Sequence, residues 1–452
     1  MLKALFPAAA LCTVVAMRLG ATAFAQQSFD PSAYAALAGP SESVPPPGTK
    51  ITTANWQQYK RFLSVGLQAL FSGRYFWKIP AEAVLEVGPT IKIGLPKKYR
   101  EDTEKYSQSV KLVPRTDGGY TVSGYTAGVP FPTLDPKDPL VGMKIVYNNY
   151  YNYIPYMVLT EAGPKEGKGW TGEDRFYSKT WSYVYEIYFK LNHLSDPGYG
   201  VAAPIREGDI FLSQNNVVWQ PEQSKYVNDL LIFYDDPARD PEVYVFVPAL
   251  RRSLRLSSAA RCAPLLGGDY VADDSREGLN IQLLIFQAKL LGEKRVLQIA
   301  HATDGFYDYR NYYLPLSFAN PNVGKWEPRD VWVVNVRRIP SLQSGYCYGS
   351  RVVYFDKETF EPVDVDLYDA SNKLWKIVLN AYQPIPLPDG DPADLVTALG
   401  GPGNLNSALW DIQNLHLTFD IQGHSKINKE VPGQYQDLHR WGTPAGMQQV
   451  MQ

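Results

Sequence analysis

Short runs in which apolar and polar residues alternate make up most of this chain. The clearest run is Trp181 to Leu191, in which one side carries Trp181, Tyr183, Tyr185, Ile187, Phe189 and Leu191. Because successive side chains of a strand point to opposite faces, this run predicts a strand with one large apolar face. Such a face packs against a hydrophobic core or against a hydrophobic ligand.

Similar runs recur from Tyr75 to about Tyr382, divided by turn sequences such as Asp196-Pro197-Gly198. They predict strands at Tyr120–Tyr125, Lys144–Tyr147, Glu242–Val247, Leu279–Leu290, Val331–Val336, Arg351–Phe355 and Leu374–Leu379. Repeated strands without long intervening helices favour a large antiparallel sheet that is curved or partly closed. We therefore expect a mainly β (α+β) fold with one domain over residues 51–452. A long C-terminal extension begins at about residue 383 and ends in a short strand near Leu415–Ile421.

One helix is predicted before the strands, from Thr53 to Ser72. It would carry Trp56, Tyr59, Leu63, Leu67 and Leu70 on one face and end at Gly73. Residues 26–50 are rich in Ala, Pro, Ser and Gly, and we expect a flexible leader that packs little.

The first 25 residues have the pattern of a cleavable export signal. Lys3 precedes an apolar stretch, and Ala23-Phe24-Ala25 matches a cleavage site with small residues. A lipoprotein site at Cys12 is the alternative, although Leu11 is large for the position before a modified cysteine. No later stretch has about 20 consecutive apolar residues, so the expected location is the periplasm, with peripheral contact to the outer membrane left open.

The charge balance argues against a nucleic acid partner. The formal net charge is −2 at pH 7, and no long basic tract is present. Cleavage of the signal leaves two cysteines, Cys262 and Cys347. An exported protein commonly bridges such a pair, while two separate buried thiols are the alternative.

No catalytic or cofactor-binding motif is evident, so we expect no cofactor, no metal and no enzymatic activity. The five histidines, His193, His301, His416, His424 and His439, lack zinc-ligand spacing. Two groups of acidic residues offer oxygen ligands for calcium, although turn capping explains them better. They are Asp235, Asp236 and Asp240 in one turn and Asp269, Asp273 and Asp274 in another. Asp364 and Asp366 share one face of a strand and could perform acid–base chemistry, but exposed polar positions on a half-buried strand are the preferred interpretation.

Two arginine pairs follow predicted strands, Arg251-Arg252 and Arg337-Arg338. Paired guanidinium groups can bind a phosphate or a carboxylate, so a lipid headgroup or an acidic partner is conceivable. Structural pairing with the acidic turns is the alternative.

An ordered series of local stretches resembles the exported bacterial family called domain of unknown function 1329. The stretches are Gly128-Val129-Pro130-Phe131-Pro132, Lys144 to Asn148, Tyr234 to Pro237, Val245 to Arg252, Gly268-Asp269 with Asp273-Asp274, Arg351 to Asp356 and Asp366 to Asp369. Members of this family look like enlarged relatives of the lipoprotein-sorting proteins LolA and LolB. The resemblance implies an incomplete β-barrel, with covering helices over a concave apolar face that binds acyl chains or another hydrophobic molecule. Members also tend to be encoded beside export pumps and outer-membrane channels, which suggests an inner-membrane pump and an outer-membrane protein as partners.

These observations favour a periplasmic carrier that binds a lipid or another hydrophobic molecule without covalent chemistry. The expected ligand-binding residues, for each of which core packing is the alternative, are Trp56, Leu63, Leu67, Trp181, Tyr183, Tyr185, Ile187 and Phe189. An outer-membrane channel component and an exported hydrolase with a carboxylate-lined groove are the other functions considered.

Overall fold

The computed structural model describes most of the chain beyond residue 26. The described ranges are 27–73, 79–171, 174–187, 193–196, 210–220, 222–234, 241–257, 261–264, 268–313, 318–387, 395–396, 404–414, 416–421 and 425–451. The expected signal and Phe189 lie outside these ranges. For residues 160–187 the course of the backbone is described but the side chains are not.

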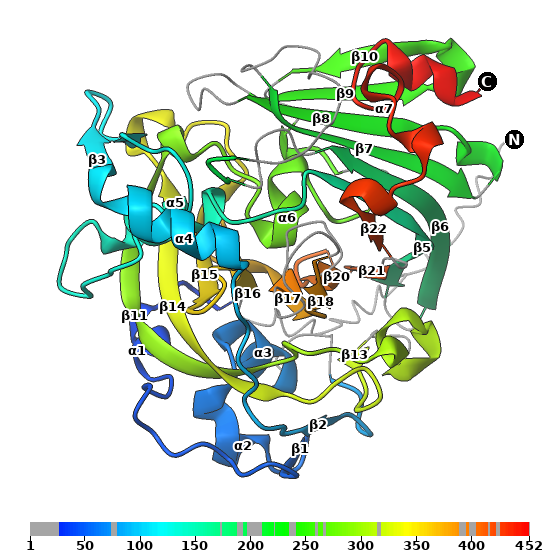
Figure 1. Ribbon diagram of the computed structural model, residues 1–452. Coiled ribbons are helices and arrows are strands. Elements are labelled where there is room, and N and C mark those ends of the chain that lie inside the picture. The colour runs from blue at the N-terminus through cyan, green and yellow to red at the C-terminus, as the bar shows by residue number, and fades with distance from the viewer. Residues whose placement is uncertain are drawn as a thin grey trace, which may run out of the picture.

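The fold is built on one large antiparallel sheet, in which the described strands number 14. Apart from β22, they follow the order β10-β9-β8-β7-β6-β5-β21-β20-β17-β16-β15-β14-β11, and β22 pairs with β5. Their bounds are β5 Met157–Thr171, β6 Asp174–Ile187, β7 Ile210–Gln220, β8 Asn228–Tyr234, β9 Glu242–Val247, β10 Arg252–Leu256, β11 Phe286–Gln298, β14 Glu327–Arg338, β15 Tyr348–Asp356, β16 Pro362–Asp369, β17 Leu374–Tyr382, β20 Asn404–Asp411, β21 His416–Ile421 and β22 Ser425–Ile427. The described part of β10 does not pair with that of β11, so the sheet is curved and open, as an incomplete barrel requires (Figure 1).

The C-terminal strands complete the sheet in its middle. β21 pairs on one side with β20 and on the other with β5, where Leu417 lies opposite Lys168. The half built from β5 to β10 is thereby joined to the half built from β11 to β20. The strands β20, β21 and β22 beyond residue 383 are therefore part of the main sheet, and the strand expected near Leu415–Ile421 is confirmed as β21.

Four small sheets and seven short helices lie around the large sheet. The small sheets pair β1 (Lys50–Thr52) with β2 (Val84–Glu86), β3 (Lys111–Pro114) with β4 (Tyr120–Ser123), β12 (Tyr312–Tyr313) with β13 (Phe318–Ala319), and β18 (Ile385–Pro386) with β19 (Leu395–Val396). The helices in the described ranges are α1 Pro31–Ala35, α2 Trp56–Tyr59, α3 Val65–Phe71, α4 Lys97–Tyr106, α5 Val141–Tyr150, α6 Ser275–Gly278 and α7 Leu438–Trp441.

The helix expected over Thr53–Ser72 is broken. A 3₁₀ turn at Lys60–Phe62 follows α2, and Leu63 is extended before α3 begins. The Ser64 side chain accepts a hydrogen bond from the backbone N–H of Leu67 and so caps α3. Gly73 does end the helical stretch as expected, with a positive φ of 60°.

Two strand predictions were wrong. Lys144–Tyr147 lies within α5, which buries residues on more than one side, including Val141, Ile145 and Asn148. An alternation over four residues cannot distinguish a strand from a helix buried in this way. Leu279–Leu290 contains a 3₁₀ turn at Leu283–Ile285, and β11 begins only at Phe286.

The half of the sheet from β11 to β20 is covered on both faces. Val352 and Tyr354 belong to one buried cluster with residues of α1, α2 and α3, whereas Val353 and Phe355 belong to a second cluster with residues of α5. In Figure 1 the blue α2 and α3 lie below β16 and β17, while the cyan α4 and α5 lie at the upper left. A third cluster packs Met157 and Leu159 of β5 against the C-terminal residues Val431 and Met447.

Residues 27–38 of the expected leader pack against the sheet, so the expectation that the leader packs little is wrong for this part, whereas most of residues 41–50 are exposed. Asp30 caps α1, and Tyr34, Leu37 and Ala38 are almost fully buried. The apolar residues between the prolines and serines were too few to reveal this packing in the sequence. We call residues 27–73 the N-terminal cover.

Cys262 and Cys347 form a disulfide, with Cα atoms 5.8 Å apart. The bond ties the segment that leads to α6 to the start of β15. In the described part of the chain, no helix combines the length and apolar character needed to cross a membrane.

Candidate binding site

A small aromatic pocket lies at the border between the N-terminal cover, the β12–β13 hairpin and the large sheet. It has a volume of about 40 Å³. Its lining residues are Gln298, Ile299, Tyr312, Phe318, Ala319, Trp326, Leu379, Asn380, Ala381, Ala408 and Trp410. The lining contains no charged residue, so the pocket suits a neutral apolar group.

A row of aromatic rings connects this pocket with the cover. Trp56 of α2 stacks on Phe71 of α3 with ring centroids 5.6 Å apart. Phe71 meets Phe318 edge to face at 6.4 Å, and Phe318 stacks on Trp326 at 5.8 Å. Aromatic pairs in these arrangements add about 0.5–1.5 kcal/mol each beyond the area they bury. The position of the cover therefore affects two residues that line the pocket.

The expected ligand-binding residues of the cover all lie in the core on this side of the sheet. Trp56 is 8% exposed, and Leu63 and Leu67 are fully buried. None of the three lines the pocket, although Trp56 reaches it through the aromatic row.

The expected residues of β6 do not gather at this pocket in the described backbone. The register places Tyr185 opposite Leu159 and Ile187 opposite Met157. Leu159 and Met157 belong to the cluster that packs on the C-terminal segment. The side chains of Trp181, Tyr183, Tyr185 and Ile187 lie outside the described part, so their role stays a prediction.

Two aspartates are buried where the cover meets β16, which corrects the interpretation of Asp364 and Asp366 as exposed polar positions. Their exposed fractions are 1% and 0%. The Oδ2 atom of Asp366 accepts hydrogen bonds from the hydroxyls of Tyr34 (2.9 Å) and Tyr354 (3.1 Å). Burial raises the pKa of Asp366 to about 7 and the pKa of Asp364 well above its usual value. An open carboxylate-lined groove is therefore not formed by these two residues.

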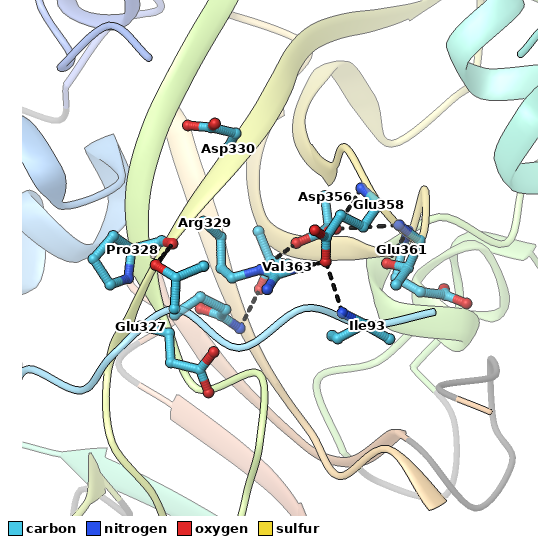
Figure 2. A network of polar contacts seen from close by, with 12 residues as sticks. Ile93, Glu327, Pro328, Arg329, Asp330, Asp356, Glu358, Glu361 and Val363 are labelled. Atoms are coloured by element: carbon cyan, nitrogen blue, oxygen red, sulfur yellow. Dashed lines mark hydrogen bonds and ion pairs between the residues drawn. The ribbon is translucent and has the colours of Figure 1, made fainter. Parts of the chain in front are cut away.

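A second polar network fixes the segment before α4 to the start of β14 (Figure 2). The Arg329 guanidinium, only 2% exposed, donates to Asp356 Oδ2 (2.7 Å), to Glu358 Oε2 (2.8 Å) and to the carbonyl oxygen of Ile91 (2.7 Å). Glu358 Oε2 also accepts from the backbone N–H of Ile93 at 2.8 Å. Each of the three guanidinium nitrogens donates to an acceptor, and two carboxylates balance the charge, so this network serves to hold the structure together.

A third network lies on the opposite face of the sheet and contains the second acidic group. Asp274 accepts from Lys376 Nζ (3.1 Å) and from the Tyr348 hydroxyl (2.5 Å), and Arg351 lies 3.5 Å from its other oxygen. Asp273 pairs with Arg261. These contacts connect the segment around α6 to β15 and β17. Asp274 also accepts from the backbone N–H of Val271 (3.2 Å), so local turn capping is present beside the ion pairs. No local pattern in the sequence indicated the ion pairs with β15 and β17.

The two arginine pairs differ in their surroundings. Arg251 and Arg252 are exposed at the β9–β10 hairpin, and Arg251 has a positive φ of 49°. Arg337 donates to Asn372 Oδ1 at 2.8 Å, and the Arg338 guanidinium lies 4.6 Å from the ring centroid of Tyr346. The structure does not place the two pairs at one site, and their binding to a headgroup or partner stays a prediction.

Among the described residues, no group of three or more His, Cys, Asp or Glu side chains is arranged to hold a metal ion. Two of the five histidines have described ring contacts: His193 lies 2.7 Å from the carbonyl oxygen of Asn152, and His301 lies 2.8 Å from Glu327 Oε1. Both contacts tie loops to the core.

A family model described as "Protein of unknown function (DUF1329)" matches residues 50–431. The chain belongs to the DUF1329 family. The chain is also similar to the uncharacterized protein PA3922 of Pseudomonas aeruginosa. The two are 23% identical over 355 residues, which cover 75% of this chain and 70% of that protein. The family assignment made from the local stretches is confirmed.

Solved structures to which this chain is similar include three bacterial proteins. A DUF1329 family protein from Desulfovibrio piger has a TM-score of 0.44 at 12% identity and covers 68% of this chain and 100% of its own. A Vibrio parahaemolyticus domain, described provisionally as an outer membrane lipoprotein-sorting protein domain, has the same TM-score and coverage at 13% identity. The LolA superfamily protein NE2245 from Nitrosomonas europaea has a TM-score of 0.35 at 10% identity and covers 65% of this chain and 96% of its own. Likeness at this level carries no inference about what the DUF1329 chain binds.

Proposed function

We propose that this DUF1329 protein is a periplasmic carrier that binds a neutral hydrophobic molecule non-covalently, and that the aromatic pocket receives the apolar end of this molecule. The observation that carries the proposal is the pocket lining, which combines Tyr312, Phe318, Trp326 and Trp410 with small alanines and has no charge. Burial of apolar surface is then the driving force for binding.

The size of the pocket limits what it can hold in this conformation. A cavity of about 150 Å³ lined by apolar side chains binds benzene, whereas this one has about 40 Å³. The pocket therefore accepts a methyl or short alkyl end as it stands, and a ring or a longer chain needs the cover or the hairpin to move. Phe318 lines the pocket and also contacts Phe71 in the aromatic row, so a movement of the cover would displace a residue of the pocket lining.

A role in transport would also require protein partners that supply and accept the bound molecule. A carrier in the periplasm would receive its cargo from an inner-membrane export pump and deliver it to an outer-membrane protein. The exposed Arg251 and Arg252 are candidates for contact with an acidic partner or with lipid headgroups.

Filling the pocket tests the proposal. Ala381 lines the pocket and is 9% exposed, and valine suits its position in β17. Binding of the neutral fluorophore N-phenyl-1-naphthylamine should weaken at least tenfold in Ala381→Val, because the added methyl groups occupy the space of the ligand. The exposed Ala81→Val is the matched control and should bind as the native protein does.

Native mass spectrometry of the protein purified from its own periplasm identifies the cargo. A bound acyl or polycyclic molecule that is missing from Ala381→Val supports the carrier. Equal fluorophore binding by Ala381→Val, Ala81→Val and the native protein would show that the pocket is not the binding site.

A further inference from the structure

The buried aspartates under the N-terminal cover have no positive charge to balance them. In the described part of the chain, no lysine, arginine or histidine forms an ion pair with Asp364 or Asp366. Both oxygens of Asp364 and the Oδ1 atom of Asp366 are buried without a hydrogen bond of normal geometry. A buried ionised carboxylate in such surroundings costs several kcal/mol, so the neutral acid is the stable form.

The groups that face the two carboxyls come from every element packed around them, and none is cationic. Tyr34 of α1, Tyr354 of β15 and Tyr368 of β16 contribute hydroxyls, and Tyr34 and Tyr368 are hydrogen-bonded at 2.6 Å. The start of α3 contributes the Ser64 hydroxyl and the backbone of Val65 and Gly66. β17 contributes the apolar Ile377 and the buried Tyr382, which interacts electrostatically with Asp364. Within this set, a proton is the only positive charge that can neutralise the pair.

We propose that Asp364 and Asp366 form a proton-binding site that locks the N-terminal cover onto the sheet beside the aromatic pocket. The carboxyls and their tyrosine partners join the cover to the sheet through Tyr34 on α1 and through the Tyr354 hydroxyl, which accepts from the Val65 N–H of α3 at 2.9 Å. Loss of both protons leaves two like charges on adjacent positions of one strand face. The sheet cannot part to hydrate them, whereas the cover can move away and admit water.

The direction of the pH effect follows from the raised pKa values. Burial brings the pKa of Asp366 to about 7 in the folded protein, compared with about 4 in an unfolded chain. The stabilising effect of the neutral pair is therefore complete below about pH 4 and is lost as the pH rises through about 7. The cover is locked in acid and released in mild alkali, and α3 carries Phe71, which touches Phe318 of the pocket.

Hydrogen exchange of the backbone amides of α3 tests whether the cover is held in place, and it needs no bound ligand. Protection factors, which are corrected for the intrinsic exchange rate, should fall at least tenfold for α3 between pH 6 and pH 8.5 in the native protein. Asp364→Asn/Asp366→Asn, which keeps the shape and cannot ionise, should remove this pH dependence. Asp135→Asn, at an exposed turn, is the matched control and should keep it.

Protection that is independent of pH in the native protein, or the same fall in the double variant, would refute the proton lock. If the double variant does not fold, infrared difference spectroscopy of native protein against Asp366→Asn decides the matter. A protonated carboxyl band that disappears between pH 6 and pH 8.5 is expected in the native protein and should be smaller in Asp366→Asn, which keeps only Asp364. Absence of the band at pH 6 in the native protein refutes the lock.

The link to the pocket rests on the proposed carrier function and is tested separately. Dissociation of N-phenyl-1-naphthylamine should be at least threefold faster at pH 8.5 than at pH 6 in the native protein and equal at both in the double variant. If the fluorophore does not bind at all, the carrier proposal fails while the α3 protection factors still decide the lock.

Discussion

At the scale of single residues, the most informative side chains are the buried ionisable ones. Arg329, Arg351, Asp366 and Lys376 are each at most 2% exposed. Buried ionisable groups need partners, and here the partners are far away in the sequence: Tyr34 reaches Asp366 across 332 positions. Apolar residues could be assigned to the core from their spacing, but a charged residue in a strand is placed on the surface by any local rule.

Arg329→Leu should destabilise the protein strongly, because it leaves Asp356 and Glu358 without their counter-ion in a buried site. Removal of one partner of a buried pair costs about 3–5 kcal/mol in free energy of unfolding, which urea denaturation measures. Arg310→Leu is the control, since its pair with Asp308 is 76% exposed on the arginine side and is expected to change stability by less than about 1 kcal/mol. Equal effects of the two substitutions would contradict the role assigned to Arg329.

At the scale of elements, the N-terminal cover shows what a helical pattern can and cannot predict. The spacing of Trp56, Leu63 and Leu67 correctly indicated burial on one side, and all three are buried. The break at Leu63 was not visible, because Ser64 is a common residue within helices as well as at their N-termini. Tertiary packing determines the start of α3, because the first turn of this helix contacts Tyr354 and Asp366.

Gly66→Ala should displace α3 from the sheet. A Cβ atom at residue 66 would lie 2.2 Å from Asp366 Oδ1 and 2.7 Å from Ile377 Cγ2. Overpacking of this kind costs about 1–3 kcal/mol, which the denaturation midpoint reports. Gly433→Ala has open space around it and should change the midpoint little; a similarly small effect of Gly66→Ala would mean that α3 does not rest on Asp366.

At the scale of the whole molecule, the sheet is one unit because its last strands lie in its middle. β21 and β22 both pair with β5, so the halves of the sheet depend on residues beyond 415. The disulfide adds a second long-range connection, between residues separated by 85 positions.

Cys262→Ser/Cys347→Ser should lower the free energy of unfolding by on the order of 4 kcal/mol, the value expected from chain entropy for a loop of this length. Denaturation with and without a reducing agent measures the effect. Reduction should lower the midpoint of the native protein and leave that of the double variant unchanged. A native midpoint that does not respond to full reduction would show that the bond adds no stability.

The sequence by itself determined several of the strands, their antiparallel arrangement and the family. The strands at Glu242–Val247, Val331–Val336, Arg351–Phe355 and Leu374–Leu379 are all confirmed, because alternation and turn residues act between neighbours in the chain. The family stretches were recognisable for the same reason, as each one is local.

Only the tertiary structure decided which faces of the sheet are covered and where the candidate site lies. Val352 to Phe355 is apolar on both sides, which fits burial on both faces but does not say what covers them. The pocket is formed by residues from Gln298 to Trp410 that meet only in the folded chain. The proton site likewise needs Tyr34, Ser64 and Tyr354 around Asp364 and Asp366, and this exclusion of water by distant residues is what turns two ordinary strand aspartates into a buried acid pair.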